Sequence, residues 1–301
     1  MIVGGGPAGL TAAIYAARMG MKMLLLESAA FGGRALLAPW IDNYPGFPEG
    51  LSGIDLIDKM VEQTKKFGVE TSFPAEALDI SSVGQIKRII TRRGEYQTSS
   101  IILATGTYNK RLQVPGENEF LGQGVSYCAV CDGPFFKRKV TAVIGSSDEA
   151  LEDALYLSSL SKKVIIVTQQ KEMVAPKNLM DAINEKTNIE VHEAKVNSIN
   201  GDGQVSSISV SDFNGREWAV SIDGIFISLG GAPLSGLAKK SGIMLDDKGC
   251  IIVDRRQSTN VEGIFAAGDC TCAGMQIVTA CGEGARAALQ AYQYVRSLRR
   301  T

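Results

Sequence analysis

The sequence lacks the features that mark several large classes of protein. It has no apolar stretch long enough to cross a membrane, and its net charge of −1 gives no field that would draw it to nucleic acid or to anionic lipid. Its one histidine, His192, leaves too few ligands for an ordinary zinc site, so we expect no metal. No signal peptide precedes the first motif, and we therefore expect a protein that neither enters a membrane nor is exported.

Cysteine is also scarce for a chain of 301 residues. Six cysteines are too few for a disulfide scaffold, and this favours a reducing cytoplasm as the setting. They are Cys128, Cys131, Cys250, Cys270, Cys272 and Cys281. The apolar content of 45% and the charged content of 21% are ordinary for a globular protein, and the length predicts about two domains.

A glycine-rich segment at the start of the chain predicts a dinucleotide site. Residues 4–9 read G-x-G-x-x-G and follow a short strand at 1–3; a predicted helix at 10–19 and a buried strand at 23–26 come next, and Glu27 ends that strand. Glycines let the backbone approach a pyrophosphate, whose charge meets the helix N-terminus, and Glu27 can accept hydrogen bonds from ribose hydroxyls. This order predicts a βαβ nucleotide fold.

A second βαβ pattern lies near the middle of the chain. A predicted strand at 139–144 enters the segment 145–150, which begins Gly-Ser-Ser. A helix at 151–160 and a strand at 164–167 follow. The chain therefore duplicates the nucleotide fold, and we detect no other repeat.

Between the two nucleotide patterns lies a C-x-x-C pair, Cys128 and Cys131, followed directly by Asp132. Such a dithiol can cycle with a disulfide. The same spacing also occurs in half of a zinc site, in buried structural cysteines and in the disulfides of exported proteins, but no second C-x-x-C or histidine pair accompanies it. We predict a redox pair with Asp132 as general acid; Asp132 could also cap a helix, and the two roles are compatible.

Further motifs give the chain a family resemblance. Residues 101–106 are a strand ending in A-T-G, and residues 264–269 are a strand ending in A-G-D. Together with Gly32-Gly33 and the segment 43–46, these motifs resemble the flavoprotein disulfide reductases that contain two dinucleotide folds. The chain looks most like the low-molecular-weight thioredoxin reductases, and the resemblance covers essentially its whole length.

The resemblance implies FAD as the cofactor. Asp269 would contact the ribityl or pyrophosphate part and Asn43 and Gln276 the ring, although Asp269 could instead cap a helix and Asn43 form a turn. Cys131 would face the flavin, and which sulfur attacks a partner stays open. The implied FAD-binding residues are Gly4, Gly6, Pro7, Ala8, Gly9, Glu27, Gly33, Asn43, Ala104, Thr105, Gly106, Gly268, Asp269 and Gln276.

The implied fold is α/β, with two Rossmann-like, three-layer domains around parallel sheets, the second inserted in the first. We expect an FAD-binding domain at 1–112 and 239–301 and an NADPH-like domain carrying the dithiol at 113–238. Val114-Pro115-Gly116 is the expected first linker, and the turn at 230–233 lies close to the second. A strand at 250–253 and a helix at 280–298 complete the first domain. The resemblance also suggests a homodimer.

The second nucleotide pattern departs from the family in two places. Ser147 stands where the G-x-G-x-x-A motif has its second glycine, and a side chain there obstructs the approach of a phosphate. The family's arginine-rich grip on the 2′-phosphate is replaced by the segment 168–174, Thr-Gln-Gln-Lys-Glu-Met-Val, in which only Lys171 is basic.

Three functions therefore compete. The first is flavin-dependent reduction of thioredoxin or a thioredoxin-like protein by a donor other than NADPH, such as reduced ferredoxin or a reduced deazaflavin, and we favour it. The second is the same reaction driven by NAD(P)H. The third is a non-catalytic flavin redox sensor.

The other cysteines and one methionine are harder to interpret. Cys270 and Cys272 stand next to Asp269 and could form a second relay, but small core residues are the commoner reason for such cysteines. We predict core packing for Cys250 and Cys281. Met275 stands where the family commonly has an arginine before Gln276.

Overall fold

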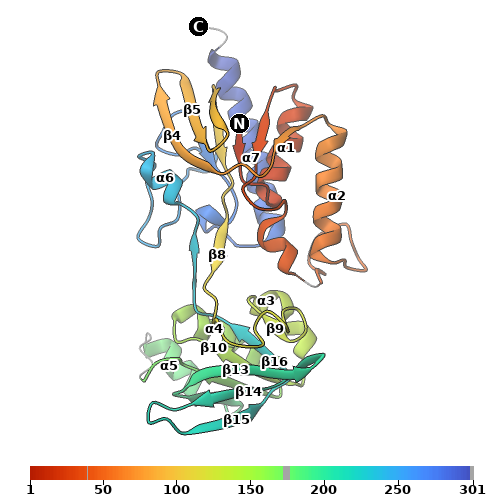
Figure 1. Cartoon of the computed structure of the whole chain (residues 1–301), viewed down its shortest axis with the longest axis vertical. Helices are drawn as coiled ribbons and strands as arrows, with labels where there is room; N and C mark the ends of the chain where they lie inside the picture. The colour runs from red at the N-terminus through yellow and green to blue at the C-terminus, as the bar shows by residue number, and fades with distance from the viewer. Residues whose placement is uncertain (39, 172–176, 299–301) are drawn as a thin grey trace. The chain divides into compact units, whose positions relative to one another are not determined.

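The computed structural model describes residues 1–38, 40–171 and 177–298. The chain forms two compact units: unit 1 contains Met1–Tyr108 and Ala232–Thr301, and unit 2 contains Asn109–Gly231. Each unit has a parallel sheet with helices beside it, which confirms the predicted α/β class (Figure 1). No helix in the described ranges is both long enough and apolar enough to cross a membrane.

Unit 1 is a three-layer structure around a five-stranded parallel sheet in the order β18-β7-β1-β2-β3. These strands are Ile264–Ala266, Ile101–Leu103, Ile2–Val3, Leu24–Leu26 and Glu70–Ser72. One face packs against the helices α1 (Pro7–Arg18), α2 (Gly53–Lys66) and α7 (Ile277–Leu298). The other face packs against the antiparallel strands β4 (Ala77–Val83), β5 (Ile86–Thr91) and β6 (Gly94–Thr98) and the helix α6 (Gly236–Lys240).

Alternating apolar residues in the short strands build both layers. Ile2 and Leu25 face the helices, whereas Val3 and Leu26 face the small sheet, and all four are buried. On the helix side, α1 and α7 approach closely because a Cβ at Gly284 would lie 2.1 Å from the carbonyl oxygen of Ala8. This close approach fixes the start of α1, where the first glycine motif ends.

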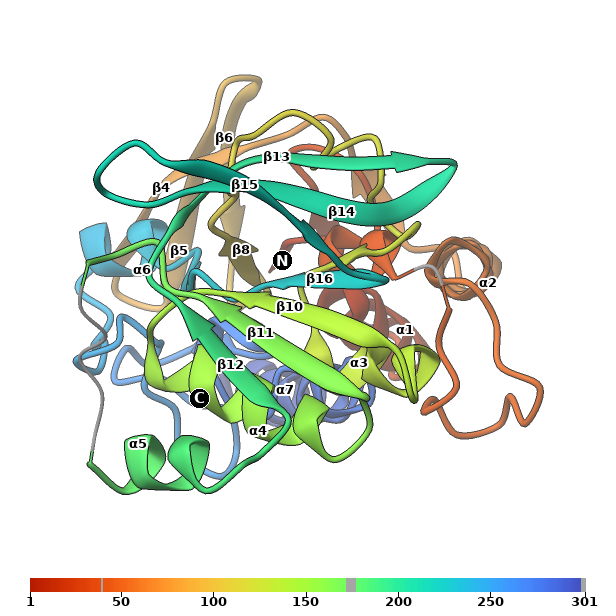
Figure 2. The same ribbon diagram turned by 90° about the horizontal axis from the view of Figure 1, so that it is seen from below.

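Unit 2 repeats the plan with a five-stranded parallel sheet in the order β12-β11-β10-β16-β9. These strands are Ile189–His192, Lys163–Val167, Val140–Ile144, Gly224–Ile227 and Val125–Ser126. Helices α3 (Ala129–Asp132), α4 (Asp148–Ser158) and α5 (Lys177–Asn184) lie on one face. Figure 2 shows the antiparallel strands β13 (Lys195–Asp202), β14 (Gln204–Ser211) and β15 (Glu217–Ser221) on the other face.

The crossings between the units lie N-terminal to the predicted boundaries. They involve β8 (Thr107–Asn109) and β17 (Gly231–Pro233), which pair in a two-stranded sheet. Pro115 and Gly116 are not a linker, since the carbonyl oxygen of Pro115 accepts a hydrogen bond from Ile199 N and a Cβ at Gly116 would lie 2.0 Å from Ile199 O. That segment is therefore packed against β13 within unit 2.

The predicted strand at 250–253 is wrong. The segment contributes only an isolated bridge between Ile251 and Leu245, because a tight turn precedes it. Asp246 Oδ1 closes that turn by accepting hydrogen bonds from Lys248 N at 2.9 Å and Cys250 N at 2.8 Å.

Candidate active site

The first glycine motif connects β1 to α1, and its glycines have different tasks. Gly4 has a φ of 105°, and a Cβ at Gly9 would lie 1.8 Å from the carbonyl oxygen of Gly4, so the fold itself requires glycine at both positions. A Cβ at Gly6 would meet only Gly32 O, 4.0 Å away. Gly6 therefore leaves open space at the N-terminus of α1, and Pro7 starts the helix there.

Glu27 holds this loop from the end of β2. Its Oε2 accepts a hydrogen bond from Gly5 N at 2.6 Å, and its Oε1 accepts one from Ala29 N at 2.7 Å. The carboxylate is buried. Burial of the carboxylate is tolerated because both of its oxygens accept hydrogen bonds from backbone N–H groups. Glu27 therefore fixes the loop between β1 and α1.

The other two motifs reach the same edge of the sheet. Ala104–Gly106 follow β7, and Gly268 and Asp269 follow β18, and both strands run parallel to β1. The carboxyl ends of parallel strands meet at one edge, which is where ligands of open α/β sheets bind. Asn43 Nδ2 also donates a hydrogen bond to Gln276 Oε1 at 3.2 Å across 233 residues of sequence. The structure thus brings these two predicted residues together.

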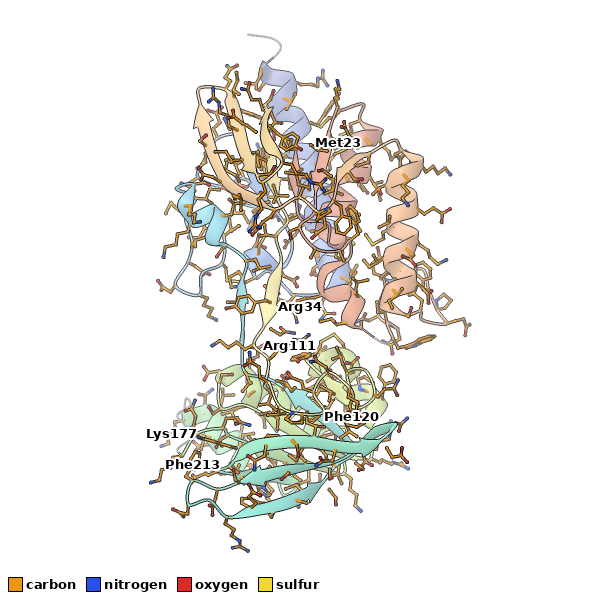
Figure 3. All side chains as sticks on the ribbon, viewed as in Figure 1. Met23, Arg34, Arg111, Phe120, Lys177 and Phe213 are labelled. Atoms are coloured by element: carbon orange, nitrogen blue, oxygen red, sulfur yellow. A yellow bond between two sulfur atoms is a disulfide. The ribbon has the colours of Figure 1, made fainter. Side chains whose placement is uncertain are left out.

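Arg34 belongs to this site and was missed in the sequence. It lies in a 3₁₀ helix, η1 (Gly33–Leu37), and its Nη1 donates a hydrogen bond to Thr107 Oγ1 at 2.8 Å (Figure 3). The same atom lies 3.7 Å from Asp269 Oδ2. Burial raises the pKa of Asp269, and the Arg34 guanidinium opposes part of that shift. The only signal in the sequence is its place directly after Gly32-Gly33.

Glu283 is a second missed residue. From α7 its Oε2 accepts hydrogen bonds from Gly268 N at 2.7 Å and Thr271 Oγ1 at 3.1 Å. Burial raises the pKa of Glu283. An acid among the small, apolar residues of the first turns of α7 was the available signal. Glu283 fixes the backbone beside Asp269, which caps no helix: the 3₁₀ helix η3 (Asp269–Thr271) is preceded by Gly268.

In unit 2, Cys128 and Cys131 form a disulfide at the start of α3. Cys131 N donates a hydrogen bond to Cys128 Sγ at 3.2 Å. Both cysteines are partly exposed, and Val130 between them is exposed. The pair is therefore accessible to another protein.

Asp132 is held by Ser126, another residue missed in the sequence. Ser126 Oγ donates a hydrogen bond to Asp132 Oδ2 at 2.6 Å and accepts one from Cys128 N at 3.0 Å. Ser126 and Asp132 are both buried. Asp132 also occupies the N-cap position of the 3₁₀ helix η2 (Gly133–Phe136), which was its alternative role, although its side chain makes no capping hydrogen bond there.

A buried carboxylate ties the start of unit 2 to the dithiol. Glu117 accepts hydrogen bonds from Leu112 N at 2.9 Å, from Gln113 N at 2.6 Å and from the Tyr127 hydroxyl. Burial, with the hydrogen bond to Glu117, raises the pKa of Tyr127 above its usual range. Since Tyr127 precedes Cys128, this network positions the disulfide relative to the first residues of the unit.

The remaining cysteines differ from expectation in one respect. Cys250 is buried in the core as predicted, but it also forms a disulfide with Cys272 that was not predicted. The pairing could not be predicted from the sequence, because Cys250 and Cys272 are 22 residues apart and meet only through the turn closed by Asp246. Cys270 and Cys281 are free and buried, which confirms core packing for Cys281.

The second nucleotide pattern has a different N-terminus. Ser147 caps α4, and its Oγ accepts a hydrogen bond from Ala150 N at 3.4 Å. Asp148 and Glu149 occupy the first turn. The Ser147 side chain thus pairs one N–H group of the helix terminus, and the two acids interact favourably with the helix dipole, as a phosphate would otherwise do.

Asp153 adds to the negative charge on α4. Ser228 Oγ, directly after β16, donates a hydrogen bond to Asp153 Oδ2 at 2.7 Å. Burial, together with repulsion from Glu149 and Glu152, raises the pKa of Asp153 to about 6, and the hydrogen bond from Ser228 opposes part of that shift. No cluster of three or more metal-ligating side chains occurs in the described ranges.

Fold and site together define a flavoprotein disulfide oxidoreductase. The model of the pyridine nucleotide-disulphide oxidoreductase family matches residues 1–284, and the chain belongs to that family. Its relatives include the thioredoxin reductases of Treponema pallidum, 38% identical over 99% of this chain and 97% of the relative, and of Peptoclostridium acidaminophilum, 40% identical over 98% and 96%.

Solved structures of thioredoxin reductases are also similar to this chain. Thioredoxin reductase from Streptococcus pyogenes is 37% identical with a TM-score of 0.94, covering 98% of this chain and 97% of that one. A ferredoxin-flavin thioredoxin reductase from Clostridium acetobutylicum is 34% identical with a TM-score of 0.56, covering 100% and 98%. The chain is an oxidoreductase of the thioredoxin reductase type, and FAD is its cofactor. The open space at Gly6 and the free start of α1 fit that group.

Replacing Gly6 by valine tests the placement of FAD. The new side chain has room in the protein, so the fold should survive, but it occupies the space that the pyrophosphate needs. We expect the purified variant to contain less than about a tenth of the normal flavin, as measured by absorbance, with an unchanged far-ultraviolet circular dichroism spectrum. A full flavin complement would show that the site is elsewhere. Gly9→Ala is the contrasting variant, which should destabilise the fold itself.

Ser126→Ala should slow disulfide reduction without loss of flavin. It removes the hydroxyl that holds Asp132 and costs about 1–3 kcal/mol of hydrogen bonding at a buried carboxyl, which would slow the reaction about five- to 150-fold if the whole cost were felt in the transition state. The measurement is turnover of a thioredoxin as a function of pH. Thr141→Ala is the control, since it removes a buried hydroxyl that pairs with Ser161 on another part of the sheet. Equal effects of both substitutions would mean that Ser126 has only a structural role.

Proposed function

We propose that this protein reduces the disulfide of thioredoxin or a thioredoxin-like protein through Cys128 and Cys131, with electrons that enter FAD from a donor other than NAD(P)H. Reduced ferredoxin and a reduced deazaflavin are the donors of suitable chemistry. The observation that carries the donor proposal is the N-terminus of α4, where Ser147 caps the helix and two acids occupy the first turn.

The proposed FAD contacts follow from the edge of the unit 1 sheet. The pyrophosphate would lie at Gly6 and the start of α1, where the backbone N–H groups of the first turn are available. Glu27 would accept hydrogen bonds from ribose, and Asp269 would contact the ribityl or pyrophosphate part. The paired amides of Asn43 and Gln276 would lie near the ring. When bound, FAD supplies the two electrons that reduce the Cys128–Cys131 disulfide.

The dithiol then performs an exchange in which atoms and electrons balance. One cysteine thiolate attacks a sulfur of the partner's disulfide and forms a mixed disulfide, and the partner's other sulfur leaves as a thiolate. The second cysteine attacks the first, which restores the Cys128–Cys131 disulfide and releases the reduced partner. Cys128 is the better attacking group, because Cys131 N already donates to its sulfur and would stabilise a thiolate there. Asp132, held by Ser126, supplies the proton to a leaving thiolate.

Charge at the second nucleotide pattern argues against NADPH. A pyrophosphate at α4 would meet Asp148 and Glu149 and would have to displace the Ser147 cap. Lys163, which could otherwise bind a 2′-phosphate, is paired with Glu190. Lys171 is exposed. The rest of the segment that replaces the family's arginine-rich grip, Glu172 to Val174, lies outside the described ranges. The ferredoxin-flavin enzyme from Clostridium, similar over the whole length, is a precedent for another donor.

Single replacements in the dithiol test the relay. Cys128→Ser and Cys131→Ser should each lower thioredoxin turnover at least about a thousandfold, because a hydroxyl cannot form the disulfide that carries the electrons. Both variants should retain bound, reducible FAD, since the proposed flavin contacts belong to unit 1. Turnover close to normal in both would exclude this pair as the relay. No turnover by the unaltered protein with any donor would favour a redox sensor.

Anaerobic reduction of the bound flavin tests the donor. NADPH at micromolar concentration should bleach the flavin band at least about a hundredfold more slowly than reduced ferredoxin or deazaflavin, since each missing charge-assisted phosphate contact costs about 1.5–3 kcal/mol. Ser147→Gly combined with Asp148→Asn and Glu149→Gln should accelerate the reaction with NADPH. Rapid bleaching of the unaltered protein by NADPH or NADH would overturn the donor proposal.

A further inference from the structure

The Cys250–Cys272 disulfide closes the segment that follows Asp269. Cys272 lies directly after η3, and the segment continues to Gln276 before α7 begins. The disulfide joins this segment to the turn at Asp246 and Cys250, 22 residues earlier in the chain. Two proposed flavin contacts, Asp269 and Gln276, therefore stand on either side of the cross-linked residue.

The backbone at Cys272 and Met275 has an unfavourable conformation. Cys272 has a φ of 59° and Met275 a φ of 42°, a left-handed region that costs free energy for residues other than glycine. The backbone hydrogen bonds of Cys272 and Gly274 are local: Cys272 N donates to Asp269 O and Gly274 N donates to Cys272 O. The long-range backbone hydrogen bond, from Ile251 N to Cys270 O at 2.8 Å, lies before Cys272. Residues 273–275 are exposed. The covalent bond to Cys250 thus contributes a long-range restraint in a segment whose own conformation is unfavourable.

The two sulfurs differ in access. Cys250 is 2% exposed, whereas Cys272 is partly exposed. Exposure therefore favours Cys272 over Cys250 as the cysteine that a thiolate from solvent attacks. Cys270 and Cys281, the free thiols of this unit, are buried and form no disulfide.

We propose that the Cys250–Cys272 disulfide is a second redox site, reducible by dithiols, that clamps the segment from Cys272 to Gln276 when oxidised and releases it when reduced. This inference rests on the proposed placement of FAD beside Asp269. The dithiol is a small molecule or a reduced thioredoxin-like protein, which is the product of the proposed reaction.

The exchange balances without a further reactant. A thiolate of the dithiol attacks Cys272 Sγ, a mixed disulfide forms, and Cys250 leaves as a thiolate that takes a proton from water. The second thiol of the dithiol then attacks the dithiol sulfur that is bonded to Cys272, which forms the cyclic or intramolecular disulfide and releases Cys272 as a thiolate. The dithiol is oxidised to its disulfide, and two cysteine thiols form in the protein.

The test uses full-length Cys128→Ser/Cys131→Ser protein with FAD bound, in which the first dithiol cannot respond. The probe is dithiothreitol, followed by native alkylation, mass spectrometry and the rate of FAD release measured by fluorescence. We expect dithiothreitol to add alkylation at Cys272, the partly exposed cysteine of the pair, and to release FAD several-fold faster. No gain in alkylation, or a gain without faster release, would overturn the proposal.

A matched variant that also carries Cys250→Ser and Cys272→Ser should release FAD at the faster rate with and without dithiothreitol. A rate that still rises with dithiothreitol would show that another site responds, against the proposal. If this variant does not fold, the alkylation count of the parent variant still decides whether the disulfide is reducible. No ferredoxin, deazaflavin, NADPH or thioredoxin enters these measurements, so their outcome is independent of the donor and the partner proposed above.

Discussion

The parallel pairing of β1 with β7 and of β7 with β18 is the constraint on which the candidate flavin site depends. It brings the carboxyl ends of three strands, distant in sequence, to one edge of the sheet. The close approach of Gly9 to the carbonyl of Gly4 then fixes the start of α1 against that edge. Glu27, Arg34 and Glu283 supply charge and hydrogen bonds that hold the loops between these elements.

Unit 2 repeats this architecture with different chemistry at the same structural position. The first turn of α1 contains no acid, and the space at Gly6 is open. The first turn of α4 contains Asp148 and Glu149 behind the Ser147 cap. The N-terminus of α1 is thus free to bind a phosphate, whereas the N-terminus of α4 is capped by Ser147 and followed by two acids. What unit 2 contributes instead is the accessible disulfide and the Ser126–Asp132 pair beside it.

Much of this was predictable because local patterns carry it. The glycine motif, the two βαβ orders and the C-x-x-C pair depend on residues close in sequence, and the structure forms the elements predicted there. Arg34, Glu283 and Ser126 were missed because their roles arise from packing between distant segments. The Cys250–Cys272 disulfide was missed for the same reason, since it depends on how the turn at Asp246 meets the segment after β18.

The central claim is that electrons pass from the flavin through Cys128 and Cys131 to a partner disulfide. Its most direct test is a single turnover that needs no natural donor. The flavin is photoreduced anaerobically and mixed with oxidised thioredoxin, while flavin absorbance and thioredoxin thiols are followed together. The account predicts that flavin reoxidation and thiol formation proceed in step, with one thioredoxin disulfide reduced per reduced flavin. A flavin that stays reduced beside oxidised thioredoxin would contradict it.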